Sequence, residues 1–140
     1  MIALDTNVLV YSVDAHEPAK QAIAQSLIDE QLQTGAGVIL PWQVACELLA
    51  CLRRWESAGR ISPDDVEEIA SRFVGLFPFV MPTLDVFALS LELHRRFSLS
   101  HWDSLLVSAC LRAGVDTLYS EDLDNGARYD TMTVVNPFAH

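Results

Sequence analysis

The stretch MIALDTNVLVY, residues 1–11, ends a short apolar run with Asp5 and continues at once with Thr6 and Asn7. Aspartate is a poor strand residue and a favoured helix N-cap, so Asp5 either begins a helix or does chemistry at the end of a strand. The pattern predicts a buried strand over residues 2–4 that leads almost directly into a helix over residues 7–13.

Further apolar runs bounded by turn residues predict four more strands, each too short and too apolar for a half-exposed hairpin. These strands cover residues 37–40, 79–81, 117–119 and 132–135. Helical spacing between the runs predicts helices over residues 18–33, 42–58, 63–76, 84–97 and 102–113. Buried strands that alternate with helices favour an α/β fold, with a parallel sheet and helices on both faces.

The helix over residues 63–76 has the clearest boundaries. Ser62 is a natural N-cap, Pro63 occupies the first helical position, and Asp64 and Asp65 lie in the first turn. Its apolar residues repeat at helical spacing, so we interpret it as a packing helix.

Size and composition fit one domain over residues 1–140, because 140 residues with 51% hydrophobic content bury an ordinary core. No apolar stretch is long enough to cross a membrane, and the first residues lack the pattern of a signal peptide. We therefore expect a cytoplasmic protein with no membrane partner. The three cysteines lack paired spacing, which argues against disulfides and zinc and favours small core residues.

The charge balance restricts the possible partners. Nineteen acidic and nine basic residues give a net charge of −10, which opposes non-specific binding of nucleic acid through a general positive field. A polyanionic partner would need a bound cation or a local arginine patch.

Four carboxylates have positions that converge in such a fold. Asp5 and Asp122 come at or just past the carboxyl ends of the first and fourth predicted strands. Asp103 lies in the first turn of the helix before the fourth strand, and Glu47 lies in the helix after the second. Ligands of parallel sheets gather at the carboxyl ends of the strands, so the four acids are candidates for one site.

Each acid also has a structural explanation of its own. Asp5 is a favoured helix cap, and the segment from Ser100 to Asp103 is a variant of a capping box. Glu47 can extend to solvent at the edge of its helix, and Asp122 can be an ordinary turn residue. If all four structural explanations held, however, the four acids would lie around one crevice only by chance.

Gathered carboxylates need a positive partner, because two like charges about 4 Å apart repel by roughly 4 kcal/mol at an effective dielectric near 20. Hard oxygen ligands favour Mg²⁺, with Mn²⁺ as an alternative, and Thr6 and Ser120 can orient them. Such a site suits hydrolysis of a phosphodiester by a metal-activated water. The cation would also make an acidic protein receptive to RNA.

Four segments, in this order, resemble the PIN domain, and especially the VapC-type toxins of toxin–antitoxin pairs. They are ALDTNVLVY (3–11), CELL (46–49), HWDSLLVSACLRAG (101–114) and LYSEDLDNG (118–126).

The resemblance implies a parallel sheet of four or five strands flanked by helices. It also implies a Mg²⁺-dependent ribonuclease whose metal ligands match the four acids Asp5, Glu47, Asp103 and Asp122. Thr6 and Ser120 match polar positions beside the first and fourth acids, Asn7 matches a common but not catalytic position, and Glu121 is an alternative to Asp122. The resemblance also implies a homodimer held inactive by a cognate antitoxin protein.

Arg54 follows Glu47 by seven residues, so it returns to the same helix face about 10 Å along the axis. It is a candidate contact for an RNA phosphate, although the arginine pairs Arg53/Arg54 and Arg95/Arg96 also fit a solvated face or a subunit contact. The aromatic residues, among them Trp42 and Trp102, favour core packing over base stacking.

Other function classes fit less well. A signalling receiver domain, which accepts a phosphoryl group at an acidic Mg²⁺ site, is expected to have a lysine after its last strand, and this chain has none there. A haloacid-dehalogenase-like phosphatase would open with Asp-x-Asp, where this chain has Asp5-Thr6-Asn7. A non-catalytic binding module with the same fold remains open and predicts no metal-dependent cleavage.

Overall fold

A single sheet forms the centre of the molecule, with strand order β3-β2-β1-β4-β6-β5. The computed structural model describes residues 1–139. Neighbouring strands run parallel except for β5 and β6, which are antiparallel. The strands are β1 (Ile2–Leu4), β2 (Val38–Pro41), β3 (Phe79–Val80), β4 (Thr117–Tyr119), β5 (Arg128–Tyr129) and β6 (Met132–Val135).

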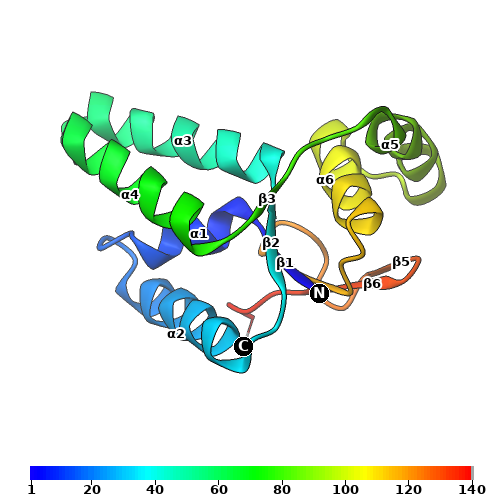
Figure 1. Ribbon diagram of the computed structural model, residues 1–140, viewed down its shortest axis with the longest axis horizontal. Helices are drawn as coiled ribbons and strands as arrows, with labels where there is room; N and C mark the ends of the chain where they lie inside the picture. The colour runs from blue at the N-terminus through cyan, green and yellow to red at the C-terminus, as the bar shows by residue number, and fades with distance from the viewer. Residues whose placement is uncertain (140) are drawn as a thin grey trace.

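Helices cover both faces of this sheet. Figure 1 shows α1 to α4 on one side of the sheet and α5 and α6 on the other. The helices are α1 (Thr6–Ser12), α2 (Pro18–Thr34), α3 (Trp42–Ser57), α4 (Pro63–Leu76), α5 (Leu84–Phe97) and α6 (His101–Arg112). The predicted α/β architecture is confirmed, and each predicted helix is found within one residue at either end.

The sheet differs from the prediction in one strand. The apolar runs indicated five strands and the resemblance four or five, whereas the sheet has six, because β5 adds to the edge through a hairpin with β6. Asp130 begins the two-residue turn of this hairpin with a φ of 52°, a conformation that aspartate tolerates. The strand itself is two residues long and contains an arginine, so no apolar run marked it.

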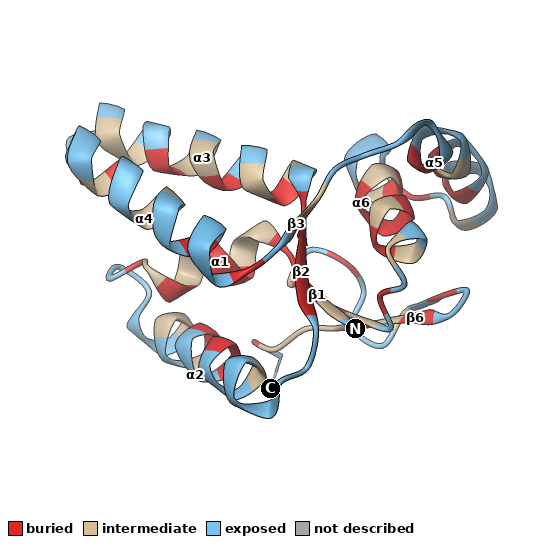
Figure 2. Cartoon of the chain, viewed as in Figure 1, coloured by how far each residue is buried: buried red, intermediate tan, exposed pale blue. Residues whose placement is uncertain are grey.

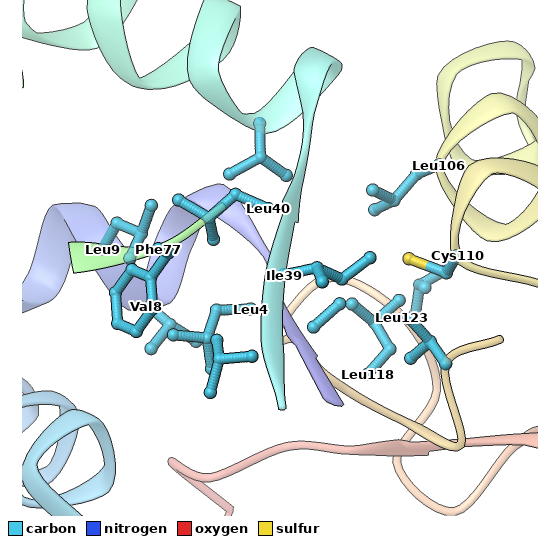
Figure 3. Packing of buried hydrophobic residues seen from close by; sticks show 14 of the residues in the cluster. Leu4, Val8, Leu9, Ile39, Leu40, Phe77, Leu106, Cys110, Leu118 and Leu123 are labelled. Carbon is cyan, nitrogen blue, oxygen red and sulfur yellow. The ribbon is translucent and has the colours of Figure 1, made fainter. Parts of the chain in front are cut away.

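The core has two layers, one on each face of the sheet. In Figure 3, Leu4, Leu40 and Phe77 lie on one side of β1 and β2, and Ile39, Leu106 and Leu118 lie on the other. Figure 2 shows buried residues along β2 and the inner sides of the helices, and exposed residues along much of the outer side of α4. Burial on both faces explains why the central strands are almost wholly apolar in sequence.

The N-terminus of α4 has the predicted cap. The Ser62 hydroxyl accepts a hydrogen bond from the Asp65 backbone N–H at 3.0 Å, and the Asp65 carboxylate accepts one from the Ser62 N–H at 2.9 Å. This reciprocal pair is a complete capping box, and Pro63 occupies the first turn. Among residues 1–139, no helix has the combined length and apolar character that a membrane crossing requires.

Candidate active site

The chain reverses its direction of travel across the sheet between β1 and β4. From β1 it first builds β2 and β3 on one side, and later β4 and β6 on the other. In open parallel sheets the carboxyl ends of the two strands at such a switch point border a crevice that binds ligands. Asp5 directly follows β1 there, and its backbone N–H extends the pairing with β4 by donating to Tyr119 O at 2.9 Å.

Asp5 is buried, with 5% of its surface exposed. Its Oδ1 accepts from the Thr6 backbone N–H at 2.7 Å, so it is the N-cap of α1. Its Oδ2 accepts from the Ser120 hydroxyl at 2.7 Å, across the sheet at the end of β4. The capping explanation for Asp5 is therefore correct, and the same side chain also lies at the switch point.

Burial raises the pKa of Asp5 from an ordinary value of 3.8 to about 6. The hydrogen bonds from Ser120 and Thr6 act in the opposite direction, and the charges of Asp122 and Glu47 raise the pKa further. Asp122 and Glu47 are therefore close enough for their charges to act on Asp5. The site holds negative charge that its own donors do not fully stabilise.

Glu47 joins Asp5 through Thr6. The Thr6 hydroxyl donates to Glu47 Oε2 at 2.9 Å, while the backbone N–H of the same residue caps Asp5. On α3, one turn earlier, Gln43 Nε2 donates to Glu47 Oε1 at 3.0 Å. Glu47 is exposed, as the solvent alternative expected, but both of its oxygens are held in place.

Asp122 is tied to the same group through Asn7 and Ser120. Asn7 Nδ2 donates to Asp122 Oδ2 at 3.2 Å, and the Asp122 backbone N–H donates to the Ser120 hydroxyl at 3.2 Å. Ser120 is fully buried and therefore links Asp5 to the segment that contains Asp122.

Several residues of this group line a cavity of about 350 Å³. Its lining includes Thr6, Asn7, Tyr11, Glu47, Arg54 and Asp122. Arg54 thus shares a cavity with two of the acids, on the helix face that its seven-residue spacing from Glu47 predicted.

Asp103 lies in the first turn of α6, where its backbone N–H donates to the Ser100 cap at 3.2 Å. The preceding residue, Trp102, accepts a bond at its carbonyl from Gln43 Nε2 at 3.2 Å, which brings the start of α6 beside the start of α3. The Asp103 carboxylate also lies near Tyr129, because burial, the charge of Asp124 and, third, the charge of Asp103 raise the pKa of Tyr129. Within the described part of the chain, no hydrogen bond joins the Asp103 carboxylate to the other three acids, so its role stays a prediction.

Glu121, the sequence alternative to Asp122, has a partner of its own. Its Oε1 pairs with Lys20 Nζ at 2.5 Å, and its backbone N–H donates to Asn7 Oδ1 at 3.3 Å. Its side chain is therefore bound to α2, whereas Asp122 lines the cavity.

Sequence reasoning did not name Gln43, and it named Asn7 only as a common, non-catalytic position of the resemblance, without its bridging role. Asn7 bridges Asp122 and the Glu121 backbone, and Gln43 bridges Glu47 and Trp102. Gln43 precedes Glu47 by four residues on a helix, and this spacing was a usable signal for a side-chain pair. Asn7 had no comparable signal, because its partners lie more than a hundred residues away.

The donor set fits a hard divalent cation. Carboxylates and hydroxyls are the ligands that Mg²⁺ and Mn²⁺ prefer, and none of the ion pairs within residues 1–139 includes Asp5, Glu47, Asp103 or Asp122. In the same residues, no three His, Cys, Asp or Glu side chains already stand in a metal-binding arrangement. Binding would thus require Glu47 and Asp122, both exposed, to turn toward Asp5.

The prediction of core packing was wrong for two tryptophans. Trp42 is 45% exposed and Trp102 is 62% exposed. Both line a second, mainly apolar cavity of about 650 Å³, which shares Glu47 with the acidic one. Trp42 is the first residue of α3 and Trp102 is the second residue of α6, and an apolar residue at a helix end is not constrained to face the core. Cys46 is also exposed, whereas Cys110 is buried as expected.

Comparisons with known proteins agree with this geometry. The family model of the PIN domain matches residues 2–130. No curated protein matches the chain in sequence. A solved toxin–antitoxin complex from Klebsiella pneumoniae is similar in structure, with a TM-score of 0.70 and 14% identity over 99% of this chain and 98% of that chain.

Two other solved structures are similar. One is VapBC2 from Rickettsia felis bound to a DNA fragment from its promoter, with a TM-score of 0.70 and 15% identity over 96% of this chain and 97% of that one. The other is VapC20 from Mycobacterium tuberculosis, a toxin that cleaves the sarcin-ricin loop, with a TM-score of 0.64 and 18% identity over 87% of this chain and 90% of that one. At these identities the similarity is one of fold.

Proposed function

Because this chain belongs to the PIN-domain family, we propose that it is a metal-dependent endoribonuclease and the toxin of a VapBC-type toxin–antitoxin pair. One observation carries the proposal: Asp5, Glu47 and Asp122 are joined through shared hydrogen-bond partners at the switch point of the sheet, without a cationic partner of their own among the described residues. The structurally similar VapC20 toxin cleaves the sarcin-ricin loop, which supports RNA as the substrate class.

In this proposal Asp5, Glu47, Asp103 and Asp122 hold Mg²⁺, or Mn²⁺ in its place. The bound cation would neutralise phosphate oxygens and acidify a water, which is the chemistry that hydrolysis of a phosphodiester needs.

The polar neighbours fix the direction of the acids. Thr6 and Ser120 each donate to a different oxygen of Asp5, which leaves its charge in one defined orientation. Thr6 also orients Glu47, and Asn7 orients Asp122. Asp5 is thus oriented before a cation binds, whereas Glu47 and Asp122 would exchange these bonds when they turn toward it.

Cleavage of a mixed RNA pool tests the proposal most directly. The wild-type protein is expected to cut RNA with Mg²⁺ and to stop with a chelator. Asp5→Asn and Asp103→Asn are each expected to lose cleavage by about a hundredfold or more, since each removes a proposed ligand. Asp29→Asn, the same charge change at an exposed position of α2, is the matched control and should cut normally.

Two outcomes would contradict the proposal. Full activity in Asp5→Asn would remove that residue from the site, and a folded wild-type protein that cuts no RNA with either metal would favour the non-catalytic binding module.

Arg54 is proposed to hold an RNA phosphate beside the acids, because it lines their cavity. Arg54→Ala should weaken RNA binding and reduce the slope of log K against log salt by about one unit, as expected for one lost phosphate contact. Arg53→Ala is the control, since the neighbouring arginine is exposed and is not part of the cavity lining. An unchanged slope in Arg54→Ala would contradict the phosphate role.

The remaining parts of the proposal concern partners. The protein is proposed to act in the cytoplasm, to form a homodimer, and to be inhibited by a cognate antitoxin. Sedimentation equilibrium would give twice the 15.5 kDa chain mass for a dimer.

A further inference from the structure

We propose that Lys20 is a positioning residue: it neutralises Glu121 and so holds the segment Ser120–Asp122 with Asp122 facing the acidic cavity. This inference rests on the proposed function for its effect on cleavage. Its effect on the segment itself is a property of the protein alone.

Lys20 lies in the first turn of α2 and contacts two other parts of the chain. Its Nζ pairs with Glu121 Oε1 at 2.5 Å and donates to the Tyr11 hydroxyl at 3.2 Å. It also lies 4.6 Å from the centre of the Tyr11 ring, and that ring packs edge-on against Phe138 at 5.0 Å. Lys20 thus connects α2 to α1 and to the segment after β4.

The pair is partly shielded from water. The Lys20 side chain is 33% exposed and that of Glu121 is 26% exposed. The Lys20 ammonium group therefore compensates the charge of the Glu121 carboxylate directly, at a distance of 2.5 Å.

Glu121 stands between two residues of the candidate site. Ser120 bonds Asp5, and Asp122 bonds Asn7, while the Glu121 backbone N–H donates to the Asn7 side chain. Without Lys20, the Glu121 carboxylate would be an uncompensated charge immediately before Asp122. Repulsion would then favour other arrangements of residues 121 and 122, whose bonds to Asn7 and Ser120 are 3.2 to 3.3 Å long.

Lys20 is the only lysine of the chain. A second explanation is that its ammonium group binds an RNA phosphate directly. The two roles predict different results when Glu121 is also changed, because neutralising Glu121 removes the need for Lys20 only if compensation is its role.

The test is a double-mutant cycle with Lys20→Met, Glu121→Gln, the double variant and Lys20→Arg. The first readout is amide hydrogen exchange of residues 121 and 122 in metal-free protein, measured by NMR. Lys20→Met should speed exchange at both amides by about tenfold, within the range of coupling between contacting residues. The double variant and Lys20→Arg should return exchange to near the wild-type rate.

The second readout is cleavage of RNA with saturating Mg²⁺. Lys20→Met should lower kcat by about tenfold with little change in KM, and adding Glu121→Gln should restore most of the loss. Arg60→Met is the matched control, since it breaks the Arg60–Asp14 ion pair elsewhere and should leave exchange at residues 121 and 122 unchanged.

The outcomes separate the inference from the proposed function. Unchanged exchange at the two amides in Lys20→Met overturns the positioning role, whatever the activity. A raised KM that Glu121→Gln does not restore also overturns it and assigns Lys20 to RNA. If the wild-type protein cuts no RNA, the proposed function fails while the exchange measurement still decides the role of Lys20.

Discussion

Asp5 uses its two carboxylate oxygens for different purposes. Oδ1 caps α1 through the Thr6 N–H, and Oδ2 accepts from Ser120 at the end of β4. Asparagine is an equally good N-cap and keeps one oxygen for Thr6, while its amide can donate to the Ser120 hydroxyl. Asp5→Asn therefore removes the charge and leaves the local hydrogen bonds largely in place.

The first prediction concerns stability against pH for this variant, measured by urea unfolding in chelator. A carboxyl group with a raised folded pKa favours the folded state below its unfolded pKa, and this contribution is lost as pH rises through the folded pKa. For Asp5 the window runs from 3.8 to about 6. The free energy of unfolding of Asp5→Asn, minus that of wild type, should rise across this window by roughly 3 kcal/mol, at about 1.4 kcal/mol per pKa unit.

The comparison with Asp29→Asn controls for the general loss of negative charge. A difference between Asp5→Asn and wild type that stays constant from pH 4 to above pH 6 would contradict the raised pKa of Asp5.

At this scale the sequence indicated the acids and two of their supporting residues, Thr6 and Ser120, but not the roles of Asn7 and Lys20. The type and position of Asp5, Glu47 and Asp122 indicated a site because carboxylates are unexpected beside apolar strands and helix faces. Asn7 and Lys20 owe their roles to partners brought close only by the fold, at separations of 115 and 101 residues.

At the scale of elements, helix boundaries follow from local chemistry. α4 begins where Ser62 and Asp65 satisfy each other's backbone N–H groups, and its C-cap residue, Phe77, is already extended. Such signals lie within a few residues, so the sequence predicted all six helices accurately. The edge strand β5 has no local signal, because it exists only through pairing with β6.

The second prediction tests the α4 cap. Ser62→Ala removes the acceptor for the Asp65 N–H and should lower the free energy of unfolding by about 1 kcal/mol. Ser71→Ala, at an exposed interior position of the same helix, should leave stability unchanged or raise it slightly, because alanine is the better helix former. Urea unfolding followed by circular dichroism measures both, and equal effects would exclude a capping role for Ser62.

At the scale of the whole molecule, the candidate site joins the two ends of the chain. Asp5 and Thr6 come from the first strand and helix, and Ser120 and Asp122 follow β4, which pairs directly with β1. The pattern of alternating strands and helices predicted that Asp5 and Asp122 lie at the same edge of the sheet, but not that β1 and β4 are neighbours. It could not predict the orientation of Asp103, which depends on how α6 packs beside the start of α3.

The third prediction is that Mg²⁺ stabilises the whole fold at pH 7.5. A cation that binds only the folded protein adds about 2.7 kcal/mol at a concentration one hundred times its Kd, which corresponds to a rise in Tm of several degrees. Differential scanning calorimetry should show this rise for wild type and Asp29→Asn, and a much smaller one for Asp5→Asn. A Tm that does not respond to Mg²⁺ in the wild-type protein would contradict a metal site at these acids.

The pairing of β1 with β4 also sets the time at which the site can exist. Protein synthesis proceeds from the N-terminus, so a growing chain carries Asp5 long before Ser120 and Asp122 have been made. Until the ribosome has translated β4 and the following segment, Asp5 has neither its Ser120 donor nor Asp122 beside it. With the proposed activity, the messenger and the ribosome that produce this protein are therefore not exposed to it until translation is nearly complete.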